Sequence, residues 1–268
     1  MADAQDSKAC DNNNMSVWPR PSAPKNNLNL CKNNKKDYWG FNMQFESERA
    51  VFKFEESDRD LIQQLADYLD SHVDNIYKFF EVNMPKEKLV VNIIPTKEEF
   101  DVYSRQAWGQ SEKWMIGFYK NNEIIYLSLH DFKNTEHRAK YLAPKEALEY
   151  YKKTIVHEYV HYVNDIFKKV NNCGYTEKYL SDGIATYLSG QHENKDLPFD
   201  FTCEDLITRG DMYSGYYLVT KYFVENYDKA FVLDIFKSNR RSREFLKDEL
   251  FYKAKKFYQS TKYENQSI

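Results

Sequence analysis

Residues 154–163 read TIVHEYVHYV, and Glu158 is the only charged side chain in this segment. An α-helix turns about 100° per residue, so the apolar side chains of the segment form one wide face. His157, Glu158 and His161 fall on the other side of that helix. The segment therefore predicts a helix with a buried face and a separate face that carries two imidazoles and one carboxylate.

The spacing of the two histidines suits a single metal ion. Residues four apart on a helix lie about 40° apart around the axis and about 6 Å apart along it, so His157 and His161 can bind the same Zn²⁺. Glu158 lies at the edge of this face, where it can act as a base on metal-bound water. Random placement would give this H-E-x-x-H pattern in about one such chain in a hundred, so the pattern is a hypothesis. The alternative is two ordinary surface histidines on an amphipathic helix.

A third metal ligand is expected downstream, because a catalytic zinc usually takes three protein ligands and keeps one position open for water. Residues 180–190 read LSDGIATYLSG and offer Asp182 as that ligand. Glu177, five residues earlier, is the alternative ligand. Asp182 could also be only the N-terminal cap of a helix, which would leave a weak metal site with two ligands.

The two segments together resemble the gluzincin metallopeptidases, the thermolysin-like and aminopeptidase-like group. In this group an H-E-x-x-H helix is followed by a second helix that carries the third zinc ligand in a pattern like E-G-x-A-x-Y. HEYVHY at 157–162 is also similar to the motif of bacterial collagenases. DGIATY at 182–187 departs from the second pattern, since Asp182 stands where the family has Glu. Asp is one methylene shorter, so the second helix must lie closer, or the ligand must bind through water, or another residue must replace it.

The resemblance also implies a role for Tyr213. YSGYYLV at 213–219 begins another predicted helix, which has a regular apolar stripe. Aminopeptidase-like gluzincins carry a tyrosine near the start of such a helix, and its hydroxyl donates to the oxyanion of the tetrahedral intermediate. Developing negative charge on that oxygen requires a donor besides zinc. The alternative is that Tyr213 is a packing residue, one of 22 tyrosines in the chain.

The order of the predicted elements indicates an α+β fold. Residues 1–37 are rich in Asn, Lys, Ser and Pro and predict a disordered or leader-like tail. Residues 38–268 are expected to form one domain, with a sheet-containing part to about 142 and a mostly helical part from about 143. The expected strands are 45–54, 89–94, 114–119 and 123–129, with a hairpin turn at Asn121 and Asn122 between the last two. The expected helices are 57–80, with Ser57 as its cap, 96–107, with a capping box that begins at Thr96, and 144–168.

The resemblance implies that this domain is zincin-like, with a small mixed sheet before the motif helix and that helix between the two parts. It also implies that the edge strand of the sheet faces a cleft and pairs with the backbone of a substrate peptide. Met115–Tyr119 or Ile124–Ser128 would be that edge strand.

Composition narrows the possible partners and locations. A net charge of −3 gives no strong electrostatic case for nucleic acid or an anionic membrane as a partner. No run of about 18 apolar residues is present, so no membrane span is expected. The start is not a basic stretch followed by an apolar one, so no signal peptide is expected. The protein is then cytoplasmic, or it is secreted or extracytoplasmic if the sequence is a mature form.

The four cysteines are poor zinc ligand candidates, because no C-x-x-C spacing is present. They could form two disulfides in sequence order in an oxidising compartment, or they could remain free thiols. The sequence leaves both possibilities open for Cys10, Cys31, Cys173 and Cys203.

These observations lead us to expect a zinc-dependent peptidase that acts on a peptide or protein substrate. One Zn²⁺ per chain would be held by His157, His161 and Asp182, with Glu158 as general base and Tyr213 as the additional donor. One alternative is a catalytically inactive zincin-fold protein that binds a peptide or protein without cutting it. Another is a helical interaction protein in which the motif is a chance match.

Overall fold

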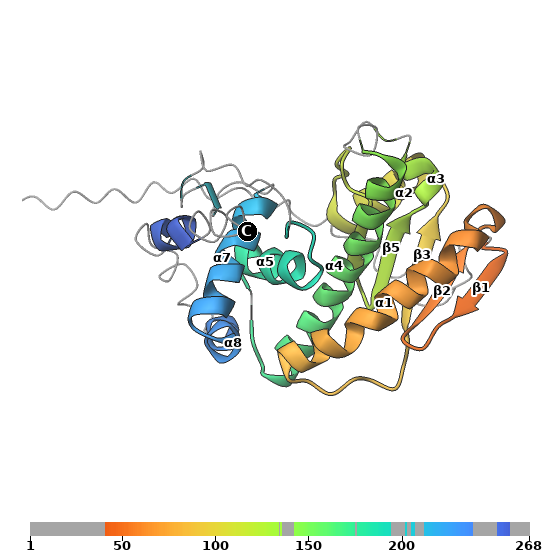
Figure 1. Ribbon diagram of the computed structural model, residues 1–268. Helices are drawn as coiled ribbons and strands as arrows, with labels where there is room; N and C mark the ends of the chain where they lie inside the picture. The colour runs from red at the N-terminus through yellow and green to blue at the C-terminus, as the bar shows by residue number, and fades with distance from the viewer. Residues whose placement is uncertain are drawn as a thin grey trace, which may run out of the picture. The chain divides into compact units, whose positions relative to one another are not determined.

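The computed structural model describes residues 41–133, 135, 142–174, 176–193, 202, 205–206, 212–237 and 251–257. Within them a five-stranded mixed sheet is followed by a mostly helical half, which confirms the α+β prediction (Figure 1). The expected tail at 1–37 lies outside the described residues. Cys173 carries a free thiol, while Cys10, Cys31 and Cys203 also lie outside them.

The sheet has parallel strands inside and antiparallel strands at its edges. Its strands are β1 (Met43–Glu46), β2 (Ala50–Phe54), β3 (Leu89–Ile94), β4 (Gly117–Lys120) and β5 (Glu123–Leu127). The spatial order is β1-β2-β3-β5-β4, with β2, β3 and β5 parallel to one another. β3 reads LVVNII and is buried along nearly its whole length, as expected for an inner strand covered on both faces.

The expected single strand at 45–54 is wrong, because the chain turns within it. β1 and β2 are separate antiparallel strands. Ser47 lies between them, and its side-chain oxygen accepts hydrogen bonds from the backbone N–H groups of Arg49 and Ala50 at 3.2 and 3.1 Å. A serine that binds the backbone two and three residues onward favours a turn. Apolar residues alternate on both sides of this turn, so the sequence pattern indicates one continuous strand.

The hairpin expected around Asn121 and Asn122 is confirmed. Both residues have positive φ, 53° and 62°, as a type I′ turn between two strands requires. The hairpin places β4 at the edge of the sheet and β5 inside it, since β5 pairs with both β3 and β4. Of the two segments expected to form the edge strand, Met115–Tyr119 therefore overlaps it. The prediction that Ile124–Ser128 forms the edge is wrong.

The helices begin close to their expected positions. They are α1 (Arg59–Phe80), α2 (Lys97–Trp108), α3 (Leu129–Phe132), α4 (Pro144–Val170), α5 (Lys178–Leu188), α7 (Tyr213–Asn226) and α8 (Lys229–Lys237), and residues 251–257 are also helical. Thr96 caps α2 as expected, because its hydroxyl accepts from the backbone N–H of Glu99 at 3.3 Å. Ser57 does not cap α1, because it lies inside a short 3-10 turn that precedes the helix.

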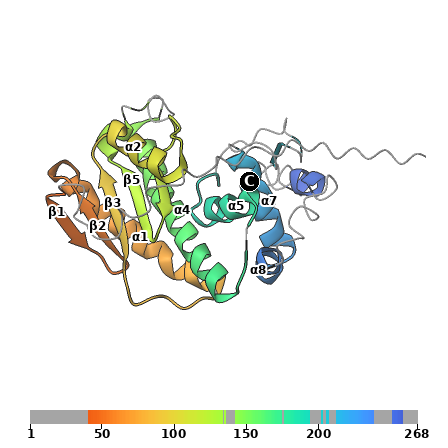
Figure 2. The same ribbon diagram turned by 180° about the vertical axis from the view of Figure 1, so that it is seen from behind.

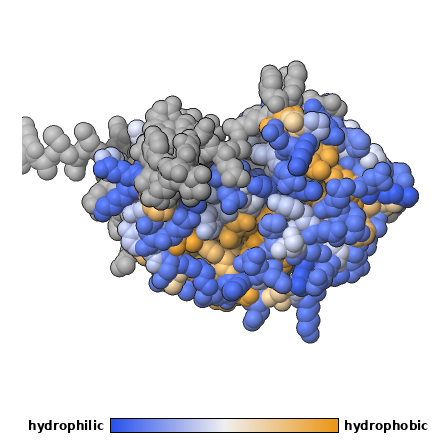
Figure 3. Space-filling model, in the orientation of Figure 1, coloured by the Kyte–Doolittle hydropathy of each residue, from blue (hydrophilic) through white to orange (hydrophobic). Residues whose placement is uncertain are grey.

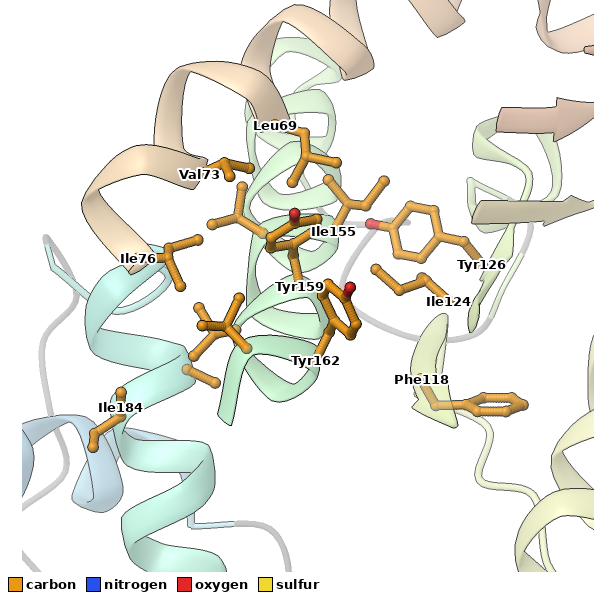
Figure 4. Packing of buried hydrophobic residues seen from close by; sticks show 14 of the residues in the cluster. Leu69, Val73, Ile76, Phe118, Ile124, Tyr126, Ile155, Tyr159, Tyr162 and Ile184 are labelled. Atoms are coloured by element: carbon orange, nitrogen blue, oxygen red, sulfur yellow. The ribbon is translucent and has the colours of Figure 1, made fainter. Parts of the chain in front are cut away.

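The motif helix α4 lies between the sheet and the later helices in both views (Figures 1 and 2). It contacts α1, β4 and β5 on one side and α5 on another. Its apolar face is buried, with Ile155 and Tyr159 pointing into a core that includes Leu69 and Val73 of α1 and Ile124 of β5 (Figure 4). α4 therefore shares a core with the sheet while its polar face is turned toward β4 and α5.

The outer surface in the orientation of Figure 1 is mostly hydrophilic, with apolar side chains showing in a hollow across its middle (Figure 3). Among the described residues, no helix combines the length and the apolar character needed to cross a bilayer.

Candidate metal centre

The polar face of α4 is enclosed by the elements around it. His157 and Glu158 are buried, with 5% and 8% of their surface exposed, and His161 is half-buried. The Nε2 atoms of His157 and His161 are 3.1 Å apart. The two imidazoles that the sequence placed on one helix face therefore point their Nε2 atoms at the same position.

Asp182 of α5 faces the same position. Its Oδ1 atom lies 3.6 Å from Nε2 of His157 and 3.7 Å from Nε2 of His161. Asp182 is not a helix cap, because α5 begins at Lys178 and its N-terminal cap residue is Glu177. Among the described residues, the group that could hold a metal ion consists of His157, His161 and Asp182, without Glu177.

The three donor atoms fit the size of a small divalent cation. A circle through three atoms that are 3.1, 3.6 and 3.7 Å apart has a radius of about 2.0 Å. Zinc binds imidazole nitrogen at about 2.0–2.1 Å and carboxylate oxygen at about 2.0–2.2 Å, so an ion near the centre of this triangle would meet all three atoms. Two imidazoles and one carboxylate also match the donor chemistry of a zinc site. The residues present could therefore hold a metal ion.

The protonation of the donors suits metal binding. Burial, aided by the nearby His157, lowers the pKa of the His161 imidazole to about 3. Burial alone would raise the pKa of Asp182, but a hydrogen bond with His157 and the charge of Lys178 hold it well below its usual range. Near neutral pH, His161 is thus neutral and Asp182 ionised, which are the states that bind a cation.

Lys178 lies one helical turn before Asp182 and neutralises its charge. Its Nζ atom is 2.9 Å from Oδ2 of Asp182 and 3.4 Å from the Tyr213 hydroxyl. Oδ2 is therefore bound to the ammonium group, while Oδ1 faces the two histidines. Sequence reasoning missed Lys178, although a lysine four residues before an aspartate on a helix is a recognisable ion-pair spacing.

Glu158 is held against the edge strand. Its Oε2 atom accepts a hydrogen bond from the backbone N–H of Tyr119 in β4 at 3.0 Å. Burial raises the pKa of the Glu158 carboxyl to about 6, a shift that His157 opposes and Asp182 increases. A carboxyl group with a pKa close to the working pH is suited to accept and return a proton.

Gly117 makes room for the ring of Tyr126, its partner on β5. A Cβ atom at this position would lie 2.5 Å from a ring carbon of Tyr126 and 3.4 Å from Cγ of Glu158. Tyr126 is fully buried and its hydroxyl donates to the carbonyl of Tyr151, so its ring has little room to move.

Replacing this glycine should therefore destabilise the fold. We expect Gly117→Ala to lower the free energy of unfolding by about 1–3 kcal/mol, the usual cost of overpacking a core. Urea denaturation of the parent and the variant measures this difference. An unchanged midpoint would show that Tyr126 moves aside without cost.

Tyr213, the first residue of α7, lies beside the metal position. Its ring centre is 6.0 Å from that of His157 and 5.9 Å from that of Trp114. Burial and the nearby Asp182 raise the pKa of the Tyr213 phenol well above its usual range. The hydroxyl therefore keeps its proton and can donate a hydrogen bond. The structure thus brings Tyr213 next to His157.

These residues line one cleft of about 1010 Å³. Its walls come from β4 and the loop before it, from α4, and from the starts of α5 and α7. Aromatic side chains on these walls include Trp108, Trp114, Tyr119, Tyr150 and Tyr213. Sequence reasoning named Tyr119 only as the end of a candidate edge strand. It did not single out Trp108, Trp114, Tyr150 or the buried His192, since only the fold brings them together.

The chain was also compared with known proteins. No family model matches this chain, and no curated protein matches it either.

Proposed function

We propose that the protein is a zinc-dependent peptidase of the gluzincin type, with a zincin-like arrangement of sheet, motif helix and later helices. The observation that carries this proposal is the convergence of His157, His161 and Asp182 on one position, with the buried Glu158 next to it. A zinc ion held there would act as a Lewis acid toward the peptide carbonyl and would lower the pKa of a water molecule. Every other part of the reaction falls to residues of the chain.

Glu158 is the general base in this proposal. It takes the proton of the attacking water and later passes it to the leaving amine. The hydrogen bond from Tyr119 N–H fixes Oε2 of Glu158, which leaves Oε1 for the proton. The pKa of about 6 keeps a large fraction of Glu158 ionised near neutral pH.

The edge strand offers a backbone template for an extended peptide. Leu127 N–H donates to the carbonyl of Ile116 at 2.8 Å. Since hydrogen bonds alternate along an antiparallel pair, the backbone groups of Gly117 and Tyr119 point away from β5, and the Tyr119 N–H is taken by Glu158. The backbone N–H and carbonyl of Gly117 and the carbonyl of Tyr119 are then available to form hydrogen bonds with a substrate peptide, which would add to the sheet as a further strand.

Tyr213 is the donor to the oxyanion. Its protonated hydroxyl lies on the wall of the cleft beside His157, at the start of α7. A donor that is fixed before the reaction stabilises the charge that develops on the carbonyl oxygen.

Metal analysis together with peptide-library cleavage tests the proposal. We expect about one zinc per chain after gentle purification, and cleavage that stops with a chelator and returns with added zinc. Metal that is absent and not taken up would instead favour an inactive zincin-fold protein that binds a peptide. A double variant with His157→Ala and His161→Ala tests whether the motif is a chance match. In that case its stability equals that of the parent, with or without chelator.

A further inference from the structure

The Ser181 hydroxyl lies between a proposed metal ligand and a buried amide. Its Oγ atom is 3.4 Å from Nδ1 of His161 and accepts from Nδ2 of Asn164 at 3.2 Å. Ser181 directly precedes Asp182 on α5, and Asn164 follows His161 by one turn on α4. The three side chains therefore link the two helices on the side of His161 that faces away from the metal position.

One polar atom of the Asn164 side chain lacks a hydrogen-bond partner in this arrangement of the described residues. Its side chain is buried, with 3% of the residue exposed, and Oδ1 has no hydrogen-bond partner in the part of the chain that the structure describes. A buried acceptor without a donor is costly, so such an atom calls for an explanation. A half turn of the amide would exchange Nδ2 and Oδ1 and would offer Oδ1 to the Ser181 hydroxyl.

The chain of hydrogen bonds has two directions, one for each neutral tautomer of His161. With the proton on Nε2, the Ser181 hydroxyl donates to Nδ1 and accepts from Asn164 Nδ2. With the proton on Nδ1, that N–H donates to Ser181 Oγ, and the Ser181 hydroxyl donates to Asn164 Oδ1 after the half turn. A metal ion on Nε2 requires the second tautomer, in which the His161 N–H, the Ser181 hydroxyl and Oδ1 of Asn164 each have a partner along the chain.

We propose that Ser181 and Asn164 are positioning residues that hold His161 in its metal-binding tautomer through this hydrogen-bond chain. The inference rests on the proposed metal site. Outer groups of this kind fix the ring orientation and the tautomer of a histidine ligand. Here they matter more than usual, because Asp182 is short and the site depends on a fixed placement of its two histidines. Nδ1 of His157 is buried without such a partner among the described residues, so His161 is the histidine that can be held in this way.

The test compares zinc affinity, measured by competition with a chelator, for the full chain and its variants. We expect Ser181→Ala to weaken zinc binding by about 10–100-fold, the usual effect of removing an outer-shell partner. Ser181→Thr keeps the hydroxyl and should bind zinc nearly as the parent does. Ser189→Ala is the matched control, because it removes a buried serine hydroxyl at the C-terminal cap of the same helix, where that hydroxyl donates to the backbone carbonyl of Thr186.

Asn164 supplies the second arm of the test. If Asn164 acts through Ser181, the double variant with Ser181→Ala and Asn164→Ala binds zinc no more weakly than Ser181→Ala alone. The visible absorption spectrum of the Co²⁺ form gives an independent readout, since Ser181→Ala should change it and Ser189→Ala should not.

Each outcome bears on a different claim. Zinc binding by Ser181→Ala within twofold of the parent overturns the inference, and so do additive losses in the double variant. A parent that binds zinc but cleaves no peptide overturns the proposed function and leaves this inference standing. A parent that takes up no zinc overturns both.

Discussion

Glu158→Gln is expected to bind zinc as the parent does and to lower kcat on a peptide substrate by about 10²–10⁴-fold. Glutamine has nearly the same shape, and its carbonyl oxygen can still accept the hydrogen bond from Tyr119 N–H. It cannot take up the proton of the attacking water. Casein hydrolysis by the two proteins, loaded to equal zinc content, measures the effect. The comparison separates a catalytic role of Glu158 from a role in building the site.

Glu149→Gln is the matched control for this variant. Glu149 lies on the same helix, and its side chain is about half exposed and paired with Lys152. The same change of charge there should leave both zinc binding and hydrolysis close to those of the parent. A Glu158→Gln variant that cleaves casein as fast as the parent would remove Glu158 from the mechanism.

The sequence predicted α4 and the direction of its faces well, because a helical period depends only on local geometry. The apolar residues of TIVHEYVHYV are buried, and the two histidines meet on the other face. The hairpin at Asn121 and Asn122 was predictable for a similar reason, since its turn demands residues that tolerate positive φ.

Other parts of the site depend on where helices begin and which strands pair. The sequence could not decide whether Asp182 or Glu177 is the third ligand. That choice depends on where α5 starts, because the start decides which residue faces α4. The edge strand could not be chosen from two apolar segments, since strand order is a long-range property. The bond between Tyr119 N–H and Glu158 involves a backbone group, which no residue type reveals.

Asp182 can serve as a ligand only if α5 lies at the right distance from α4, and the packing of α5 on α7 fixes that distance. Gly183 is a point of close approach between these two helices. A Cβ atom there would lie 2.3 Å from Oγ1 of Thr220 and 2.9 Å from the backbone carbonyl oxygen of Tyr216. The glycine that follows the proposed ligand in DGIATY is therefore explained by helix packing.

Gly183→Ala should consequently disturb both stability and metal binding. The added methyl group must push α5 away from the α7 backbone, which cannot give way as a flexible side chain would. We expect the free energy of unfolding to fall by about 1–3 kcal/mol, the range for overpacked cores. We also expect zinc affinity to fall at least about tenfold, since bond lengths in such a site tolerate only about 0.2 Å. Denaturation with and without zinc and chelator competition measure the two effects.

Gly109→Ala is the control that separates these two effects. Gly109 has a φ of +78° at the end of α2 and open space around its Cβ position, so alanine there is strained without touching α5. It should cost about 1 kcal/mol of stability and leave zinc affinity unchanged. If Gly183→Ala also keeps the parental zinc affinity, the position of α5 does not control the metal site. The shorter carboxylate of Asp182 would then reach the ion through its own rotation, and the contact between α5 and α7 would serve stability alone.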